Sequence, residues 1–207
     1  VSLYNGRLQT RRFASSMTIS ILDYGLGNAG SISNMFRKIG ASAAMAATPA
    51  ELGSASKILL PGVGSFDAGM RALEARGLVE PLLERARAGI PILGICLGMQ
   101  LLARASDEGA LPGLGLFDAR CQRFQMPAAS ALKVPHMGWA LLARQRDSRL
   151  LRGLDESARF YFVHSYHVVC ADRQDVVATS DYGGAFVSMI ERGNVMGAQF
   201  HPEKSHR

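Results

Sequence analysis

The heptapeptide Gly94-Ile95-Cys96-Leu97-Gly98-Met99-Gln100 places a cysteine between two glycines, directly after an apolar run that contains Ile90, Ile92 and Leu93. The residues that follow have helical apolar spacing. A strand that turns sharply into a helix through small residues is typical of a nucleophile elbow, where the side chain at the turn stands out from the strand end. The first backbone N–H groups of such a helix favour a thiolate and an oxyanion formed beside it. The heptapeptide therefore predicts Cys96 as a nucleophile.

A second motif, His201-Pro202-Glu203, lies near the other end of the chain and also follows an apolar run. It offers an imidazole as a base and a carboxylate that could orient it. Each motif alone has a plain structural explanation, because a buried cysteine is usually a small hydrophobic residue and His-Pro-Glu is usually a turn. Both motifs at the ends of predicted strands favour a hydrolytic triad of Cys96, His201 and Glu203.

Two glycine-rich turns follow earlier predicted strands. Pro61-Gly62-Val63-Gly64-Ser65-Phe66 could turn backbone N–H groups towards a ligand, and it lacks the Gly-Lys-Ser/Thr ending of a phosphate-binding loop. An oxyanion strand is favoured over a plain loop. Gly25-Leu26-Gly27-Asn28-Ala29-Gly30 matches the dinucleotide fingerprint, but the next strand ends at Met45-Ala46-Ala47-Thr48-Pro49 without the acidic residue that would hold a ribose. A tight turn that places Asn28 near the strand's carboxyl end is the better interpretation.

Strands and helices alternate in the first half of the chain, and short strands fill the second half. This order predicts an α/β fold with three layers: a mostly parallel central sheet with helices on both faces, plus an antiparallel β region in the C-terminal half. The change follows Leu111-Pro112-Gly113. The expected strands are 18–22, 43–46, 57–60 and the cysteine strand, then 119–124, 140–142, 158–163, 168–170, 176–179, 186–191 and 195–199. The expected helices are 30–39, 49–52, 66–76, 81–88 and the helix after Cys96.

Composition limits the class of protein. A chain of 207 residues suits one domain. Its 3 cysteines contain no Cys-x-x-Cys pair, which predicts a reducing, cytoplasmic location with no disulfide framework and no structural zinc site. We expect neither a metal site nor a cofactor. The net charge of +6 comes from scattered basic residues, so nucleic-acid binding is not expected, and no apolar run is long enough for a membrane span. We expect residues 1–16 to be a non-native or disordered extension and residues 17–207 to form the domain.

Several further motifs carry a family resemblance over nearly the whole chain. Together with the three stretches above, they are Asp23-Tyr24-Gly25-x-Gly27-Asn28, Pro135-His136-Met137-Gly138-Trp139, Phe162-Val163-His164-Ser165-Tyr166 and the ending Lys204-Ser205. The chain resembles the class I (triad) glutamine amidotransferases. Within them it is most similar to the glutaminase subunits of imidazole glycerol phosphate synthase, of histidine biosynthesis.

The resemblance implies a reaction and a set of site residues. Cys96 would attack the side-chain carbonyl of L-glutamine, His201 would transfer the proton, and Glu203 would orient the imidazole. The oxyanion would be held by the N–H of Leu97 and that of Val63 or Gly64. The ammonia would pass to a (β/α)₈-barrel cyclase partner in a heterodimer. The substrate-binding residues would be Gly62, Gln100, Ser165 and Tyr166, and the interface residues Asn28, Met137, Trp139, Tyr161, His164 and Lys204.

Some alternatives remain open at this stage. The chain could be a different glutaminase subunit, a cysteine or γ-glutamyl peptidase that acts alone, or a non-catalytic binding protein. Members of the family usually continue through a terminal helix beyond the triad, and that helix is apparently missing here. We therefore expect His201 and Glu203 to lie on a poorly anchored tail.

Overall fold

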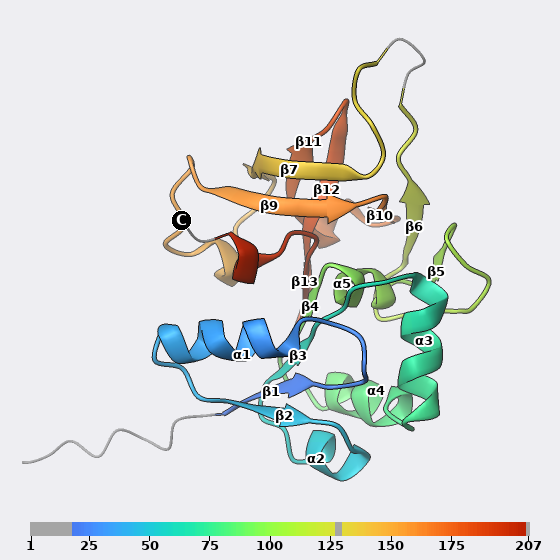
Figure 1. Cartoon of the computed structure of the whole chain (residues 1–207), viewed down its shortest axis with the longest axis vertical. Helices are drawn as coiled ribbons and strands as arrows, with labels where there is room; N and C mark the ends of the chain where they lie inside the picture. Colours follow the sequence, from blue (N-terminus) through green and yellow to red (C-terminus); the bar gives the residue numbers. More distant parts are fainter. Residues whose placement is uncertain (1–17, 127–129, 206–207) are drawn as a thin grey trace, which may run out of the picture.

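The computed structural model describes residues 18–126 and 130–205 (Figure 1). The predicted extension over residues 1–16 lies outside them. The helices and strands, in chain order, are β1 (Ile19–Leu22), α1 (Ala29–Lys38), β2 (Ala43–Ala46), α2 (Pro49–Gly53), β3 (Ile58–Leu60), α3 (Phe66–Ala75), α4 (Val79–Arg87), β4 (Ile92–Ile95), α5 (Leu97–Leu101), β5 (Ala105–Ser106), β6 (Ala119–Arg123), β7 (His136–Leu141), β8 (Ala143–Arg144), η1 (Arg149–Leu151), β9 (Arg159–His164), β10 (Tyr166–Cys170), η2 (Arg173–Asp175), β11 (Val176–Asp181), β12 (Ala185–Arg192), β13 (Val195–Ala198) and η3 (Pro202–Lys204).

The central sheet begins with parallel strands in the order β2-β1-β3-β4-β13. Its strands β3 and β4 are short apolar runs, as expected for strands covered on both faces. The last strand of the chain, β13, pairs in parallel with β4, with Ala198 opposite Ile95. This pairing brings the residues that follow β13 beside those that follow β4, although about half of the sequence separates them.

Helices cover both faces of this parallel part. On one face α2, α3, α4 and α5 contribute to the largest apolar cluster, and on the other α1 packs through Ile32 against Ile21 and Leu59. Local sequence explains several boundaries. For example, Thr48 and Glu51 form a capping box at the start of α2, where each side chain accepts hydrogen bonds from the other end of the first turn. The predicted three-layer α/β architecture is confirmed.

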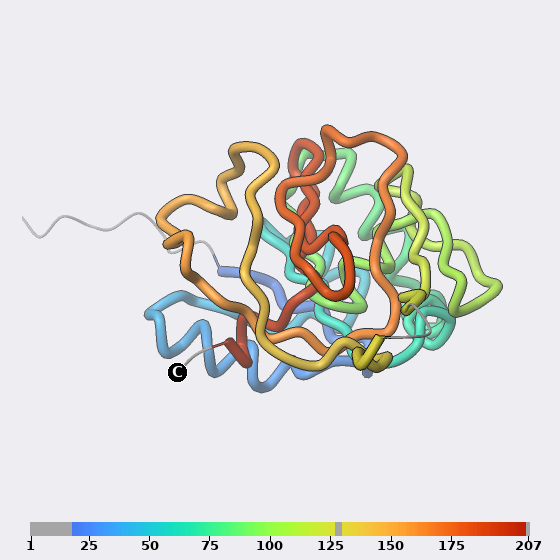
Figure 2. The backbone as a smooth tube through the Cα atoms, turned by 90° about the horizontal axis from the view of Figure 1, so that it is seen from above, coloured from blue at the N-terminus to red at the C-terminus, as the bar shows by residue number. Residues whose placement is uncertain are grey.

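The second half of the chain extends the sheet with antiparallel strands. β12 pairs with β13, and β10, β6 and β11 continue outward from it. These strands, yellow to red, rise above the parallel half in Figure 1, and Figure 2 shows them from above. A separate two-stranded sheet, β7–β9, lies across them and shares their apolar cluster.

One predicted strand has the wrong bounds. The sequence indicated a strand at 140–142, whereas the structure has the longer β7 over His136–Leu141 and then β8 over Ala143–Arg144. In β7, His136 is buried and Gly138 and Ala140 are partly buried, whereas the exposed positions are the large apolar residues. Gly138 and Ala140 weaken the strand signal of this segment, because glycine and alanine are depleted in strands.

Candidate active site

Cys96 occupies the turn between β4 and α5. Its φ of 54° is the one positive φ of a non-glycine residue within the described ranges. A conformation of this kind costs about 1–3 kcal/mol and is found where the surrounding structure enforces it, often at functional sites. Here the Cys96 N–H donates to the carbonyl of Ala198 at 2.8 Å, which ties the elbow to β13.

The two glycines beside Cys96 are required by close packing. A Cβ at Gly98 would lie 1.9 Å from the backbone oxygen of Leu60, and one at Gly94 would lie 2.6 Å from the backbone oxygen of Gly98. Both contacts are with backbone atoms, which cannot rotate away. The glycines therefore let the elbow press against β3, and this holds the cysteine at the carboxyl edge of the sheet.

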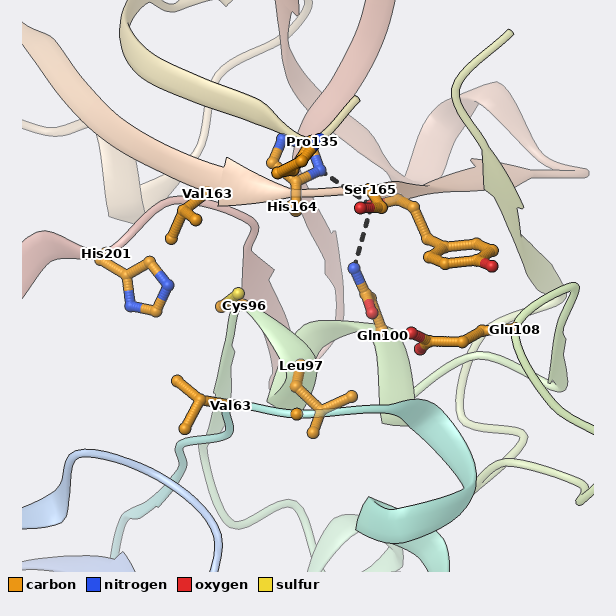
Figure 3. Close-up of a pocket in the computed structure, with 12 residues that line it drawn as sticks. Val63, Cys96, Leu97, Gln100, Glu108, Pro135, Val163, His164, Ser165 and His201 are labelled. Carbon is orange, nitrogen blue, oxygen red and sulfur yellow. Dashed lines mark hydrogen bonds between the residues drawn. The ribbon is translucent and has the colours of Figure 1, made fainter. Parts of the chain in front are cut away.

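His201 and Glu203 follow β13 at the same edge. The Nδ1 of His201 lies 2.8 Å from Oε1 of Glu203, and both side chains are almost fully buried. The other ring nitrogen, Nε2, is buried without a hydrogen-bond partner among the described residues, and the ring lies beside Cys96 (Figure 3). Burial alone would lower the pKa of His201, but polar interactions with Cys96 and Glu203 and their charges raise it to about 9.

The tail that carries these two residues is well tied to the body of the protein. The N–H of His201 donates to the carbonyl of Tyr161 on β9 at 3.0 Å. The hydroxyl of Ser205 donates to the carbonyl of His201 at 2.7 Å and accepts from the N–H of Tyr161 at 2.9 Å. The expectation of a poorly anchored tail is therefore wrong, because β9 supplies the anchor.

A cavity of about 420 Å³ opens over Cys96. Figure 3 shows Cys96 and Leu97 at its floor, His201 on one side and Gln100 on the other. Its lining residues are Val63, Gly64, Cys96, Leu97, Gln100, Glu108, Pro135, Val163, His164, Ser165, Tyr166 and His201. The volume suits a ligand of amino-acid size.

Residues 61–65, predicted as the oxyanion strand, form a loop between β3 and α3 in the structure, and this rim loop is one side of the cavity. Val63 and Gly64 line it, and Gly64 has a φ of +122°. The rim loop is held by the buried Tyr24, whose hydroxyl donates to the carbonyl of Pro61 at 2.6 Å. Gly62 does not line the cavity; a Cβ there would lie 2.6 Å from the hydroxyl of Tyr24, so this glycine allows the rim loop to pack closely.

The wall opposite His201 is polar. Gln100 donates through Nε2 to the carbonyl of Tyr166 at 3.0 Å, and Ser165 lies beside it. Glu108, which was not expected from the sequence, also lines this wall (Figure 3). Its carboxylate accepts from the N–H of Phe66 at 2.8 Å. A lone acidic residue in a turn carries no sequence signal, and only the fold brings it to the cavity.

The expected interface residues occupy different environments. On β7, Met137 and Trp139 are 62% and 37% exposed, and Trp139 packs edge-on against Tyr161 at a centroid distance of 5.9 Å. Lys204 is exposed in η3, and Asn28 is partly buried at the start of α1. His164 is only 6% exposed and lines the cavity, so its side chain does not reach the outer surface.

Residues 18–126 and 130–205 contain neither a metal centre nor a membrane-spanning helix. No group of three or more His, Cys, Asp or Glu side chains in these ranges could hold a metal ion. None of the helices they form is long and apolar enough to cross a membrane.

The fold and this site define a class of protein. The family model for class I glutamine amidotransferases matches residues 20–207, and the chain belongs to that family. Solved structures share the fold: a crystal structure of a glutamine amidotransferase has a TM-score of 0.65 at 19% identity, covering 89% of this chain and 90% of that one. The crystal structure of a glutamine amidotransferase from Thermotoga maritima has a TM-score of 0.64 at 21% identity, covering 92% and 77%.

Closer relatives place the chain within the family. It is 45% identical over 190 residues to the imidazole glycerol phosphate synthase subunit HisH 2 of Methanococcus maripaludis, which covers 91% of this chain and 93% of the relative. It is 47% identical over 188 residues to subunit HisH of Desulfitobacterium hafniense strain Y51, which covers 90% and 87%. The chain therefore belongs with the HisH subunits.

Proposed function

We propose that this chain is the glutaminase subunit of an imidazole glycerol phosphate synthase and supplies ammonia to a cyclase partner. The observation that carries the proposal is the convergence of Cys96 and the buried His201–Glu203 pair at one edge of the sheet, beside a cavity of amino-acid size. The triad roles expected from the sequence fit this arrangement.

The chemistry proceeds through a thioester. The sulfur of Cys96 attacks the side-chain amide carbon of glutamine, and His201 takes the thiol proton and gives it to the departing ammonia as the C–N bond breaks. Glu203 keeps Nδ1 of the ring protonated, so that Nε2 faces the sulfur. Water then hydrolyses the thioester, which releases glutamate and restores Cys96.

The oxyanion of each tetrahedral intermediate needs donors above Cys96. The N–H of Leu97 is the first backbone donor after the nucleophile, and the rim residues Val63 and Gly64 offer the second. Removal of one such donor typically slows the reaction by about 10²- to 10³-fold. The hydrogen bond from Tyr24 to Pro61 supports this role, since it fixes the start of the rim loop.

The polar wall suits the other end of glutamine. The carboxylate of Glu108 and the side-chain oxygen of Gln100 are acceptors beside the cavity, and an α-ammonium group is a donor with a positive charge. We assign Glu108 to this group. Its hydrogen bond from Phe66 leaves the other carboxylate oxygen for the ligand. Gln100, Ser165 and Tyr166 complete the wall.

The exposed face of β7 supports a protein partner. Met137, Trp139 and Leu141 are alternate residues and lie on one face of the strand. Their cross-strand neighbours on β9 include Val163, which lines the cavity. An apolar stripe that starts at the cavity mouth would let a docked partner cover the route by which ammonia leaves. We assign the stripe, with Asn28 and Lys204, to a (β/α)₈-barrel cyclase.

Glutamate release from glutamine tests the proposal. It is measured with this chain alone, with the cyclase, and with the cyclase together with its ribotide substrate. We expect strong release only in the complete mixture, and none from a Cys96→Ser variant. Equal release by the isolated chain would favour a hydrolase that acts alone, and no release with an unreactive Cys96 would contradict the proposal.

A further inference from the structure

Gln199 directly precedes the Phe200-His201 step and lies fully buried beside the nucleophile. Because β13 pairs in parallel with β4 and Ala198 is opposite Ile95, the next residue, Gln199, falls next to Cys96. Its Nε2 donates to Sγ of Cys96 at 3.7 Å. Its Oε1 accepts from Nε2 of Gln100 at 3.1 Å. One buried amide thus connects the sulfur with a residue of the cavity wall.

A backbone carbonyl sets the direction of these hydrogen bonds. The oxygen of Tyr166 can only accept, so the group of Gln100 that faces it, at 3.0 Å, must be the NH₂. The second hydrogen of that NH₂ is then directed at Gln199, which must present its oxygen. It follows that Gln199 presents its NH₂ to Cys96. With the opposite orientation, two NH₂ groups would face each other in the protein interior.

The same carbonyl is held from its other side by a buried histidine pair. The Nδ1 of His164 lies 2.8 Å from the Tyr166 oxygen and therefore carries the hydrogen. Its Nε2 then accepts from Nδ1 of His136 at 3.3 Å. Burial lowers the pKa of His136 to about 4 and that of His164 to about 3, so both rings stay neutral and keep these tautomers at neutral pH.

We propose that Gln199 is a positioning residue for glutamine hydrolysis, which holds an N–H donor on the Cys96 sulfur in an orientation fixed by the Tyr166 carbonyl through Gln100. Sulfur accepts hydrogen bonds weakly as a thiol and much better as a thiolate, so the contact favours the reactive form. His201 approaches the sulfur as the proton acceptor and Gln199 as a permanent donor. The inference rests on the proposed function, because Cys96 must be the nucleophile.

The hydrogen bonds from Gln100 to Gln199 and from Gln199 to Cys96, which we call the relay, also link the cavity to the thiol. Gln100 lines the cavity, and its NH₂ is committed to Tyr166 and Gln199, which leaves its oxygen for a ligand. A donor group of the substrate that binds this oxygen polarises the amide and strengthens its NH₂ as a donor. Gln199 passes this effect to Cys96. Substrate binding and thiolate formation are thus coupled through two amides.

The test is the pH dependence of Cys96 alkylation by iodoacetamide in the full-length chain, followed by mass spectrometry of the digested protein. Alkylation needs neither glutamine nor a partner, so a negative result is separate from a failure of the proposed function. For Gln199→Met, which cannot donate, we expect the midpoint of the alkylation profile to rise by about one pH unit, or about tenfold less thiolate at a given pH below it. For Gln199→Glu, which places a carboxylate at the sulfur, we expect a larger rise.

Two features provide controls. The alkylation of Cys121 and Cys170, measured in the same digest, is an internal control. Burial raises the pKa of both thiols, that of Cys170 to about 12. Ser188→Ala is the matched variant: Ser188 is fully buried, its carbonyl accepts from the N–H of Gln199, and its hydroxyl has no hydrogen-bond partner among the described residues, so the change removes no hydrogen bond of the Gln199 side chain. Its midpoint should equal that of the wild type.

The proposal is overturned if both Gln199 variants fold and keep the wild-type midpoint. If neither variant folds, the contact between Gln199 and Cys96 is tested in the wild-type protein, by NMR with ¹⁵N-labelled glutamine side chains. Alkylation of Cys96 should then move the side-chain amide resonances of a buried, slowly exchanging glutamine. Unchanged resonances for every glutamine on alkylation would refute the contact.

Discussion

Replacement of Glu203 by glutamine removes the buried charge beside His201 and leaves the size of the side chain unchanged. The oxygen of the new amide can still accept from Nδ1 of His201, at the position where Oε1 now lies 2.8 Å away. The change therefore isolates the charge of Glu203. It should weaken the preference of the pair for a protonated imidazole.

The expected size follows from the pKa of His201. Polar interactions and charges raise it from 6.5 to about 9 against the opposing effect of burial, and Cys96 and Glu203 share this effect. One pH unit corresponds to about 1.4 kcal/mol, so the whole rise in the pKa of His201 corresponds to about 3 kcal/mol in favour of the protonated imidazole. Loss of the part due to Glu203 should lower the pKa of His201 by about one unit.

The assay is the pH profile of glutamate release by the complex with the cyclase. In the proposed mechanism the protonated imidazole donates to the departing ammonia, so activity should fall on the alkaline side as His201 loses its proton near pH 9. In Glu203→Gln this fall should begin about one pH unit lower, and the maximal rate should drop by about 10- to 100-fold. An alkaline limb at the same pH in both proteins would refute the reasoning.

The pH dependence of the free energy of unfolding provides a second measurement, and its direction follows from the pKa of His201. Because the folded-state pKa of His201 lies above its unfolded value, the pair stabilises the fold fully below pH 6.5, and this contribution is lost as the pH rises through about 9. Urea unfolding should show a deficit for Glu203→Gln that shrinks over this range. Glu191→Gln is the control, since that carboxylate pairs with Arg149 away from His201 and should leave the alkaline limb in place.

Three further predictions concern the frame and the surface of the site. Gly98→Ala should lower the free energy of unfolding, measured in urea, by at least about 2 kcal/mol, because its Cβ would meet the Leu60 oxygen at 1.9 Å. The control is Gly30→Ala on helix α1, where the Cβ has open space; this change should raise the free energy of unfolding by about 0.5 kcal/mol. Tyr24→Phe should cost about 1–2 kcal/mol in the same assay and slow glutamate release, because the rim loop loses its 2.6 Å hydrogen bond; an unchanged rate would argue against that support. Trp139→Ala should weaken cyclase binding in calorimetry by more than about 1 kcal/mol, and unaltered binding would place the interface elsewhere.

Much of the fold could be predicted because its signals are local. The strand and helix around Cys96 follow from an apolar run, two glycines and a helical pattern. The proximity of Cys96 and His201 could also be predicted, because residues that follow parallel strands meet at one edge of the sheet. The structure adds the reason for the glycines, namely the approach of the elbow to the backbone of β3.

Other features depend on long-range packing and left no signal in the sequence. The relay through Gln199 needs the register of β13 against β4 and the position of Tyr166 on another strand. Glu108 reaches the cavity through a turn. Strand β7 was predicted too short, and its apolar residues lie on the exposed face while His136 lies inward, the reverse of the usual pattern.

The most direct test of the central claim is covalent labelling by an electrophilic glutamine analogue, such as a chloroketone, in the complex with the cyclase and its ribotide substrate. The account predicts one label on Cys96, protection by glutamine, and at least about tenfold slower labelling in His201→Ala. Labelling that falls on Cys121 or Cys170 instead, or that proceeds at the same rate without His201, would contradict a triad centred on Cys96.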